Sequence, residues 1–115
     1  MGWVSRLFGR SGGSRGGGRG AGSSGDQGVR HLRDFAESRR GVEFYLEPET
    51  ADFTTTVVAV AHDGEWTRRP VRSPRVAGDL ARSLALPLYE AKVTGYPKRM
   101  KEWSRNHPER RLGPR

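Results

Sequence analysis

Glycine is concentrated at the N-terminal end of this chain, and its placement limits where a folded core can form. Eleven of the 16 glycines lie in residues 1–28. A tract made almost entirely of Gly, Ser and Arg buries too little apolar surface to offset the entropy lost on ordering. We therefore expect residues 11–27 to form a disordered linker and the folded domain to start near residue 28.

Four segments follow from this division of the 115 residues. Residues 1–10 form a short amphipathic segment, 11–27 the linker, 28–107 a single α+β domain, and 108–115 a basic tail. Cysteine is absent from the sequence, which excludes disulfides and thiolate sites. No apolar run approaches the roughly 18 residues of a membrane-spanning helix, and the N-terminus lacks a secretory pattern. We expect a cytoplasmic protein.

The residues after the linker predict a helix followed by strands. Asp26 is the predicted N-cap, and Gly41 closes the helix. Its apolar face consists of Val29, Leu32, Phe35 and Ala36. Val42, Phe44 and Leu46 then alternate with Glu43, Tyr45 and Glu47, which is typical of a half-buried strand. Residues 53–61 predict a longer strand, and a third strand ends at Pro70.

Local signals also mark the turn and the later helices. Asp63-Gly64 predicts a two-residue hairpin turn with positive φ at both positions. Ser73-Pro74 predicts an N-cap and first-turn pair. A short extra strand is expected at 88–91, and Pro97 starts a basic helix that Pro108 ends. The resulting fold class is α+β: a small antiparallel three-stranded sheet, with 88–91 as an optional fourth strand, and helices packed on one face, in the order α-β-β-β-α-(β)-α.

Positive charge is placed mainly at the two ends of the chain. The net charge is +8, of which residues 1–28 carry +3, residues 29–94 none and residues 95–115 +5. In the last helix the cations lie away from the apolar face formed by Tyr96, Met100 and Trp103. Cations in such positions can bind backbone phosphates, and the release of counterions makes this binding favourable. The predicted nucleic-acid-binding residues are Lys98, Arg99, Lys101, Arg105, Arg110 and Arg111. This arrangement predicts a non-enzymatic accessory protein that binds RNA, DNA or a ribonucleoprotein nonspecifically.

A second function class rests on the N-terminal segment. Trp3, Val4, Leu7 and Phe8 share one face of a two-turn helix, and such a helix is marginal in isolation. These four residues are the predicted contacts in an alternative reading, an adaptor tethered to a protein groove or to an anionic membrane surface.

Residues that could carry chemistry are sparse. His31, His62 and His107 show no spacing typical of a metal site, so we expect neither a metal nor a cofactor. His62 and Asp63 adjoin, but the predicted turn accounts for both without catalysis. Trp66, next to Arg68, is either a cross-strand core residue or a platform for stacking bases. No catalytic residue and no small-molecule substrate are expected.

Two resemblances add to this reading. The element order from His31 to Leu86 resembles a double-stranded-RNA-binding domain in layout and loop lengths. Its motifs are absent, because residues 73–79 carry Arg75 and Asp79 where that family has a run of lysines, and no binding residue is transferred. The chain also resembles a family of small actinobacterial proteins in residues 3–9, the Gly/Arg linker, residues 61–69 and Tyr96-Pro97. That likeness implies a bacterial cytoplasmic protein and no particular activity.

Overall fold

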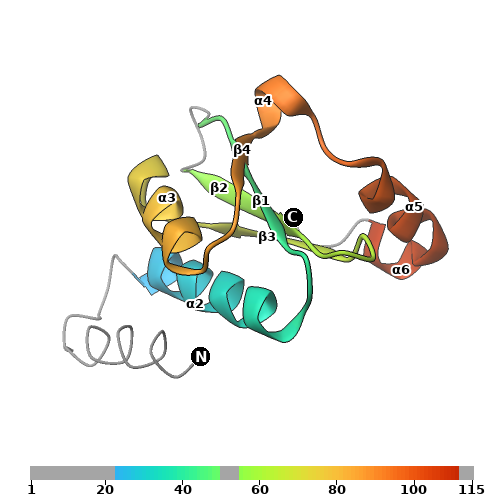
Figure 1. The fold of residues 1–115 in the computed structure, drawn as a ribbon, viewed down its shortest axis with the longest axis horizontal. Helices are drawn as coiled ribbons and strands as arrows, with labels where there is room; N and C mark the ends of the chain where they lie inside the picture. The colour runs from blue at the N-terminus through green and yellow to red at the C-terminus, as the bar shows by residue number, and fades with distance from the viewer. Residues whose placement is uncertain (1–22, 50–54, 112–115) are drawn as a thin grey trace.

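The computed structural model describes residues 23–49 and 55–111 (Figure 1). Its elements, in chain order, are α2 (Ser23–Ser38), β1 (Glu43–Glu47), β2 (Thr56–Val60), β3 (Trp66–Pro70), α3 (Pro74–Ser83), β4 (Leu88–Glu90), α4 (Ala91–Thr94), α5 (Lys98–Asn106) and α6 (Pro108–Arg111). In Figure 1, α2 and α3 lie together at one side of the strands, whereas α5 and α6 lie at the other end.

The strands form one sheet in the order β3-β2-β1-β4. Three of them, β1 to β3, make an antiparallel meander, and β4 pairs with β1 in the parallel sense, Phe44 opposite Leu88. The α+β class and the optional fourth strand near 88–91 are confirmed, but the expectation of an antiparallel sheet is wrong, because β4 makes the sheet mixed. The chain leaves β3, forms α3 and returns at the far edge beside β1, and such a crossover is what a parallel pair requires.

One face of the sheet is covered by α2 and α3. The predicted helix face is confirmed: Leu32 and Phe35 are buried, and Val29 and Ala36 pack against the same cluster. They meet Phe44 from β1. The remaining buried members of this aliphatic cluster are Val42, Val57, Ala59, Ala61, Val71, Ala77, Leu80 and Ala81.

The opposite face is also covered, by α5, so the expectation of helices on one face only is wrong. Tyr45, Val58, Val60 and Trp66 form a second buried cluster, with Met100 and Trp103 of α5 packed against it. The physical reason lies in β2, whose sequence TVVAV is apolar at successive positions. Such a strand exposes apolar side chains on both faces, and both then need a cover.

The structure shows which of the predicted helix ends are correct. The Oγ of Ser73 accepts a hydrogen bond from Val76 N at 3.2 Å, and Pro74 begins α3, as predicted. Asp26 is not the N-cap of α2, because that helix begins at Ser23 and Asp26 lies in its first turn. α5 ends at Asn106, and α6 begins at Pro108 after the single residue His107.

The hairpin between β2 and β3 differs from the predicted two-residue turn. Gly64 has φ +99, but Asp63 does not have a positive φ, so that part of the prediction is wrong. Ala61 N donates to Glu65 O at 2.8 Å and Gly64 N to Ala61 O at 2.9 Å. These bonds close a three-residue loop whose last residue takes the left-handed conformation. Asp63 stabilises it by accepting a hydrogen bond from Glu65 N at 2.9 Å.

Candidate functional site

The basic helix α5 is held against the sheet by its apolar side. Met100 and Trp103 pack on the buried cluster around Trp66. The indole Nε1 of Trp66 donates to the Oγ of Ser104 at 2.9 Å. The hairpin also touches the helix, because a Cβ added to Gly64 would lie 2.1 Å from the carbonyl oxygen of Arg99. The position of α5 is therefore set by contacts with the sheet and with the hairpin turn.

Arg99 belongs to this docking side. Its Nε donates to the carbonyl of Ala61 at 2.9 Å, and its terminal nitrogen pairs with Glu43 Oε1 at 2.8 Å. The phenol of Tyr45 donates to the same carboxylate oxygen at 2.8 Å. Burial would raise the pKa of Glu43, but the hydrogen bonds from Arg99 and Tyr45 outweigh it and hold this pKa below its usual value. Among the six predicted nucleic-acid contacts, Arg99 thus binds the domain itself.

The outer face of α5, by which we mean Lys98, Lys101, Glu102 and Arg105, is exposed. Its spacing of three, four and seven residues places these side chains on one side of the helix. Within residues 25–49 and 55–109, whose side chains the structure describes, no ion pair includes Lys98, Lys101 or Arg105.

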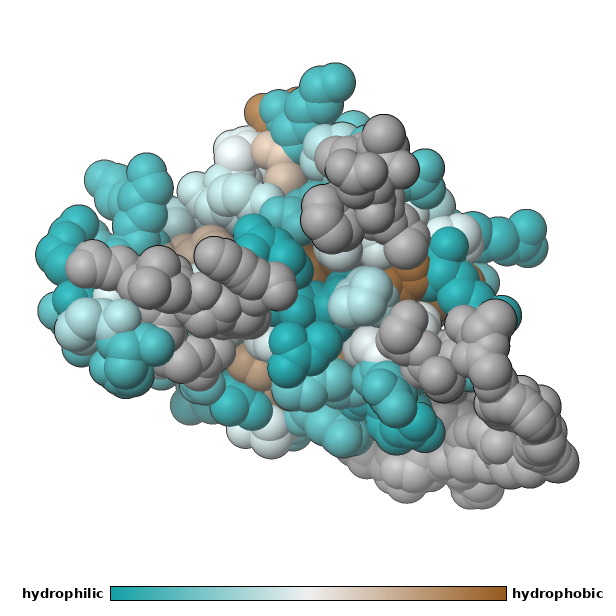
Figure 2. All heavy atoms as spheres, turned by 180° about the vertical axis from the view of Figure 1, so that it is seen from behind, coloured by the Kyte–Doolittle hydropathy of each residue, from teal (hydrophilic) through white to brown (hydrophobic). Residues whose placement is uncertain are grey.

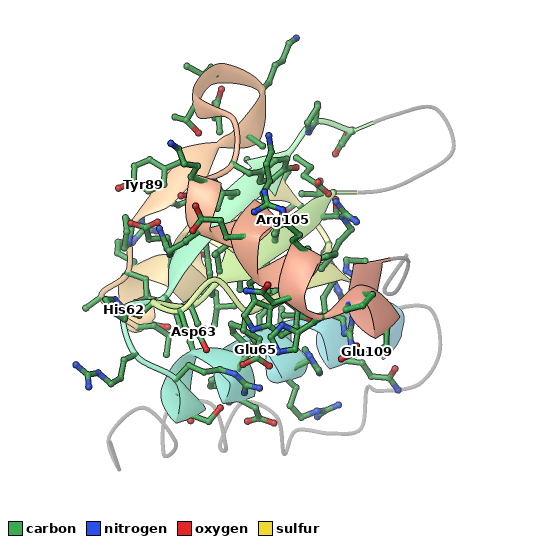
Figure 3. The ribbon with its side chains drawn as sticks, turned by 90° about the vertical axis from the view of Figure 1, so that its right-hand side faces the viewer. His62, Asp63, Glu65, Tyr89, Arg105 and Glu109 are labelled. Carbon is green, nitrogen blue, oxygen red and sulfur yellow. The ribbon has the colours of Figure 1, made fainter. Side chains whose placement is uncertain are left out.

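Six arginines of the domain, in contrast, each pair with a carboxylate. They are Arg39, Arg68, Arg72, Arg75, Arg82 and Arg99. The cations on the outer face of α5 consequently keep their charge available to an external anion. Figure 3 looks onto this helix and labels Arg105. Arg110 and Arg111 belong to α6, and their side chains lie outside the described part of the chain.

A second charged network fixes the segment that leads into α5. Arg68 contacts both carboxylate oxygens of Glu47, at 3.0 Å each. Thr56 Oγ1 donates to Glu47 at 2.6 Å, and the phenol of Tyr96 donates to the same group. Burial and the Glu47 carboxylate raise the pKa of Tyr96 to about 12, so this phenol stays neutral. Tyr96, immediately before Pro97, is thereby tied to β1.

Three tyrosines meet in a small open pocket beside this network. The pocket has a volume of about 160 Å³. The ring centroid of Tyr45 lies 5.3 Å from that of Tyr89 and 5.8 Å from that of Tyr96. We call it the tyrosine pocket, and its lining is Glu43, Tyr45, Tyr89, Thr94, Gly95, Tyr96 and Pro97. Sequence reasoning missed it, because the three rings come from β1, β4 and the loop before α5, and no spacing rule joins such positions.

The surface around this pocket includes exposed apolar groups. Tyr89 and Tyr96 are 38% and 37% exposed, and Val93 of α4 is 76% exposed. Figure 2 shows a mostly hydrophilic face with apolar surface in small areas, one of them at the α4 end at the top. In Figure 3, Tyr89 of β4 lies at the edge of the sheet.

The other residues singled out from the sequence lie apart from each other. His62 and Asp63 are exposed on the hairpin, where the Asp63 carboxylate bonds the turn backbone. The Nε2 of His31 is 3.2 Å from Thr67 Oγ1, and burial together with Arg69 lowers its pKa. Trp66 is 6% exposed, which favours its reading as a core residue over a stacking platform.

The described residues also bear on metal binding and on membrane insertion. They contain no group of three or more side chains suited to hold a metal ion. None of the helices in the described ranges is long and apolar enough to span a bilayer. Trp3, Val4, Leu7 and Phe8 lie outside the described residues, as do residues 11–22 of the predicted linker. Residues 23–27, also expected in that linker, belong to α2 instead. No protein-family model, curated protein or solved structure matches this chain.

Proposed function

We propose that this protein is a non-enzymatic nucleic-acid-binding accessory whose contact surface is the outer face of α5. The observation that carries the proposal is the contrast between the two sides of this helix. Arg99, Met100 and Trp103 hold it to the sheet, while Lys98, Lys101 and Arg105 point away and pair with no carboxylate of the described residues. The bacterial setting that we propose rests on the family resemblance, and the cytoplasmic setting rests on that resemblance and on the absence of cysteine from the sequence.

The geometry suits a phosphate backbone better than a base sequence. Lys98 and Arg105 are seven residues apart, so they span about 10 Å of helix. Cations in such a row neutralise successive phosphates and release counterions, which gives affinity without sequence preference. Glu102 lies within the row and limits its strength. Arg110 and Arg111 follow in the sequence and add charge on the C-terminal side.

The test is a fluorescence-anisotropy titration of the full chain with labelled oligonucleotides at several salt concentrations. The triple variant Lys98→Glu/Lys101→Glu/Arg105→Glu should bind at least tenfold more weakly than wild type. Each lost phosphate contact should also reduce the slope of log affinity against log salt by about 0.9 on duplex DNA. Circular dichroism should show an unchanged fold, because all three side chains are exposed.

A matched control removes the same charge elsewhere. The variant Arg30→Glu/Arg40→Glu/Arg75→Glu changes three exposed cations, Arg30 of α2, Arg40 in the segment after α2, and Arg75 of α3. Arg75 contacts the Asp79 carboxylate at 4.0 Å, a distant and exposed pair. It should bind much more tightly than the α5 triple variant. Equal losses in the two variants would show that net charge alone drives binding, and wild type that binds no oligonucleotide at low salt would overturn the proposal.

A further inference from the structure

We propose that the tyrosine pocket takes one unpaired base of a single-stranded nucleic acid whose phosphates lie on the outer face of α5. This inference rests on the proposed function and adds the form of the ligand, a single strand rather than a duplex. It is carried by the meeting of three tyrosine rings at the N-terminal end of the basic helix.

The rings are arranged so that an aromatic surface stays open. Tyr45 is only 5% exposed and forms the inner ring, whereas Tyr89 and Tyr96 are more than one third exposed. The phenols of Tyr45 and Tyr96 are fixed by Glu43 and by Glu47. Fixed aromatic rings stack bases at little entropic cost, and stacking tolerates any base because each has a π face.

Strand register explains why Tyr89 faces this side of the sheet. Tyr89 is the partner of Tyr45 in the parallel β1–β4 pair. Partners in register lie on the same face, so both rings are on the α5 side. Glu90, the next residue of β4, belongs to the opposite face by the same alternation, and it does not line the pocket.

The charges around the pocket suit a nucleotide. The Glu43 carboxylate in its lining is neutralised by Arg99 at 2.8 Å. Lys92 of α4 precedes the wall made by Thr94 and Gly95, and Lys98 follows Pro97, the last residue of that wall. Both lysines are exposed, and neither joins an ion pair within the described ranges. A base in the pocket would therefore have an ammonium group near its flanking phosphates.

The dimensions select an unpaired base. A pocket of about 160 Å³ is smaller than the roughly 300 Å³ at which sites for drug-sized ligands begin, so it suits one ring system. A base inside a duplex is stacked and paired, and its extrusion costs a few kcal/mol. Single strands offer their bases without that cost, so the pocket should favour them.

The experiment compares Tyr89→Leu with Tyr89→Phe in the full chain. The probes are a fluorescein-labelled oligo(dT) of about twelve nucleotides, a duplex of the same length, and inorganic polyphosphate as a competitor without bases. Tyr89→Leu should bind the single strand about tenfold more weakly, the loss expected for one stacked base, with its affinity for polyphosphate unchanged. Tyr89→Phe keeps the ring and should bind like wild type, which should itself prefer the single strand to the duplex.

A second measurement uses the wild-type protein, so its result does not depend on whether a variant folds. Wild-type protein irradiated with an oligonucleotide carrying 5-iodouracil should form a cross-link to Tyr89 or Tyr96, located by mass spectrometry. Cross-links only at other residues, or equal single-strand binding by Tyr89→Leu and wild type, would overturn the pocket while leaving the α5 surface in place. Failure of wild type to bind any of the three probes would instead remove the proposed function itself.

Discussion

The two faces of the sheet are closed in different ways. The face beneath α2 and α3 is sealed by aliphatic side chains and Phe44, with Leu32, Val57 and Ala77 fully buried. On the face beneath α5, aromatic rings and polar contacts hold the helix to the sheet. α5 itself contributes no fully buried residue. The first face accounts for most of the hydrophobic stabilisation, because that contribution scales with the apolar area removed from water.

The comparison separates stability from binding. A helix held by Arg99, a tryptophan and a turn needs only one of its sides for docking, and its other side is open to a ligand. α2 and α3 contribute buried side chains to the main core, and the exposed charges of α3 pair with one another, Asp79 with Arg75 and with Arg82. Three predictions test this division.

The largest effect should come from the α2/α3 face. Phe44→Ala removes a ring that is fully buried in the aliphatic cluster, and it should lower the free energy of unfolding by about 3–5 kcal/mol. Urea denaturation followed by circular dichroism measures this loss. Met100→Ala, on the partly buried α5 side, is the comparison variant and should cost clearly less. Similar losses in the two variants would mean that both faces carry the fold equally.

An intermediate effect is expected at the hairpin that supports α5. Gly64→Ala combines a φ of +99 with a Cβ only 2.1 Å from the Arg99 carbonyl, so the turn or the helix must shift. We expect a loss of about 1–3 kcal/mol in unfolding free energy and an altered tryptophan emission.

Gly41→Ala serves as the matched control for Gly64. Its φ is also positive, at +59, but the nearest atom to an added Cβ is the His62 Cβ at 3.2 Å. It should cost about 1 kcal/mol and leave the tryptophan emission unchanged. A greater loss for Gly41→Ala than for Gly64→Ala would show that the contact between the hairpin and α5 contributes nothing.

The smallest expected effect is a loss of stability at low pH that depends on Glu43. The pKa of Glu43 is lowered in the folded protein, so its stabilising contribution is complete above the ordinary carboxyl pKa of 4.5 and is lost as the pH falls toward the lowered value. Glu43→Gln should remove this part of the acid sensitivity and cost about 1 kcal/mol or less at pH 7, because the ion pair is partly exposed. Tryptophan emission between pH 7 and pH 3 measures it. An identical pH profile in the variant would exclude Glu43 as an acid-labile support of α5.

Local rules predicted the parts of the fold that depend on neighbouring residues. Ser73-Pro74 caps α3 and Pro70 ends β3, because caps and prolines act within one turn of the chain. The turn at Gly64 was predicted in place but not in type, since two turn geometries both accept glycine at that position.

Long-range contacts account for what the sequence pattern did not predict. The position of Tyr45 in an alternating strand indicated an exposed side chain, but Tyr89, Tyr96 and the helix α5, all more than 40 residues later in the sequence, cover it. The parallel pairing of β4 depends on where the crossover ends, which no local signal encodes. Among the basic residues, charge alone could not distinguish Arg99, which pairs with Glu43, from Lys98 next to it. The side of the helix on which a cation lies determines whether it binds the sheet or is open to a ligand.

The edges of the sheet also bear on how this protein behaves at high concentration. An unpaired strand edge is a template for another copy of the chain, and proteins blunt such edges with charge, proline or brevity. β3 presents Arg68 and Arg69 and ends at Pro70, whereas β4 has three residues and passes directly into α4. Both described edges therefore resist strand addition, β3 through its charges and its proline and β4 through its short length. These features protect the sheet against pairing with the strands of other copies of the chain.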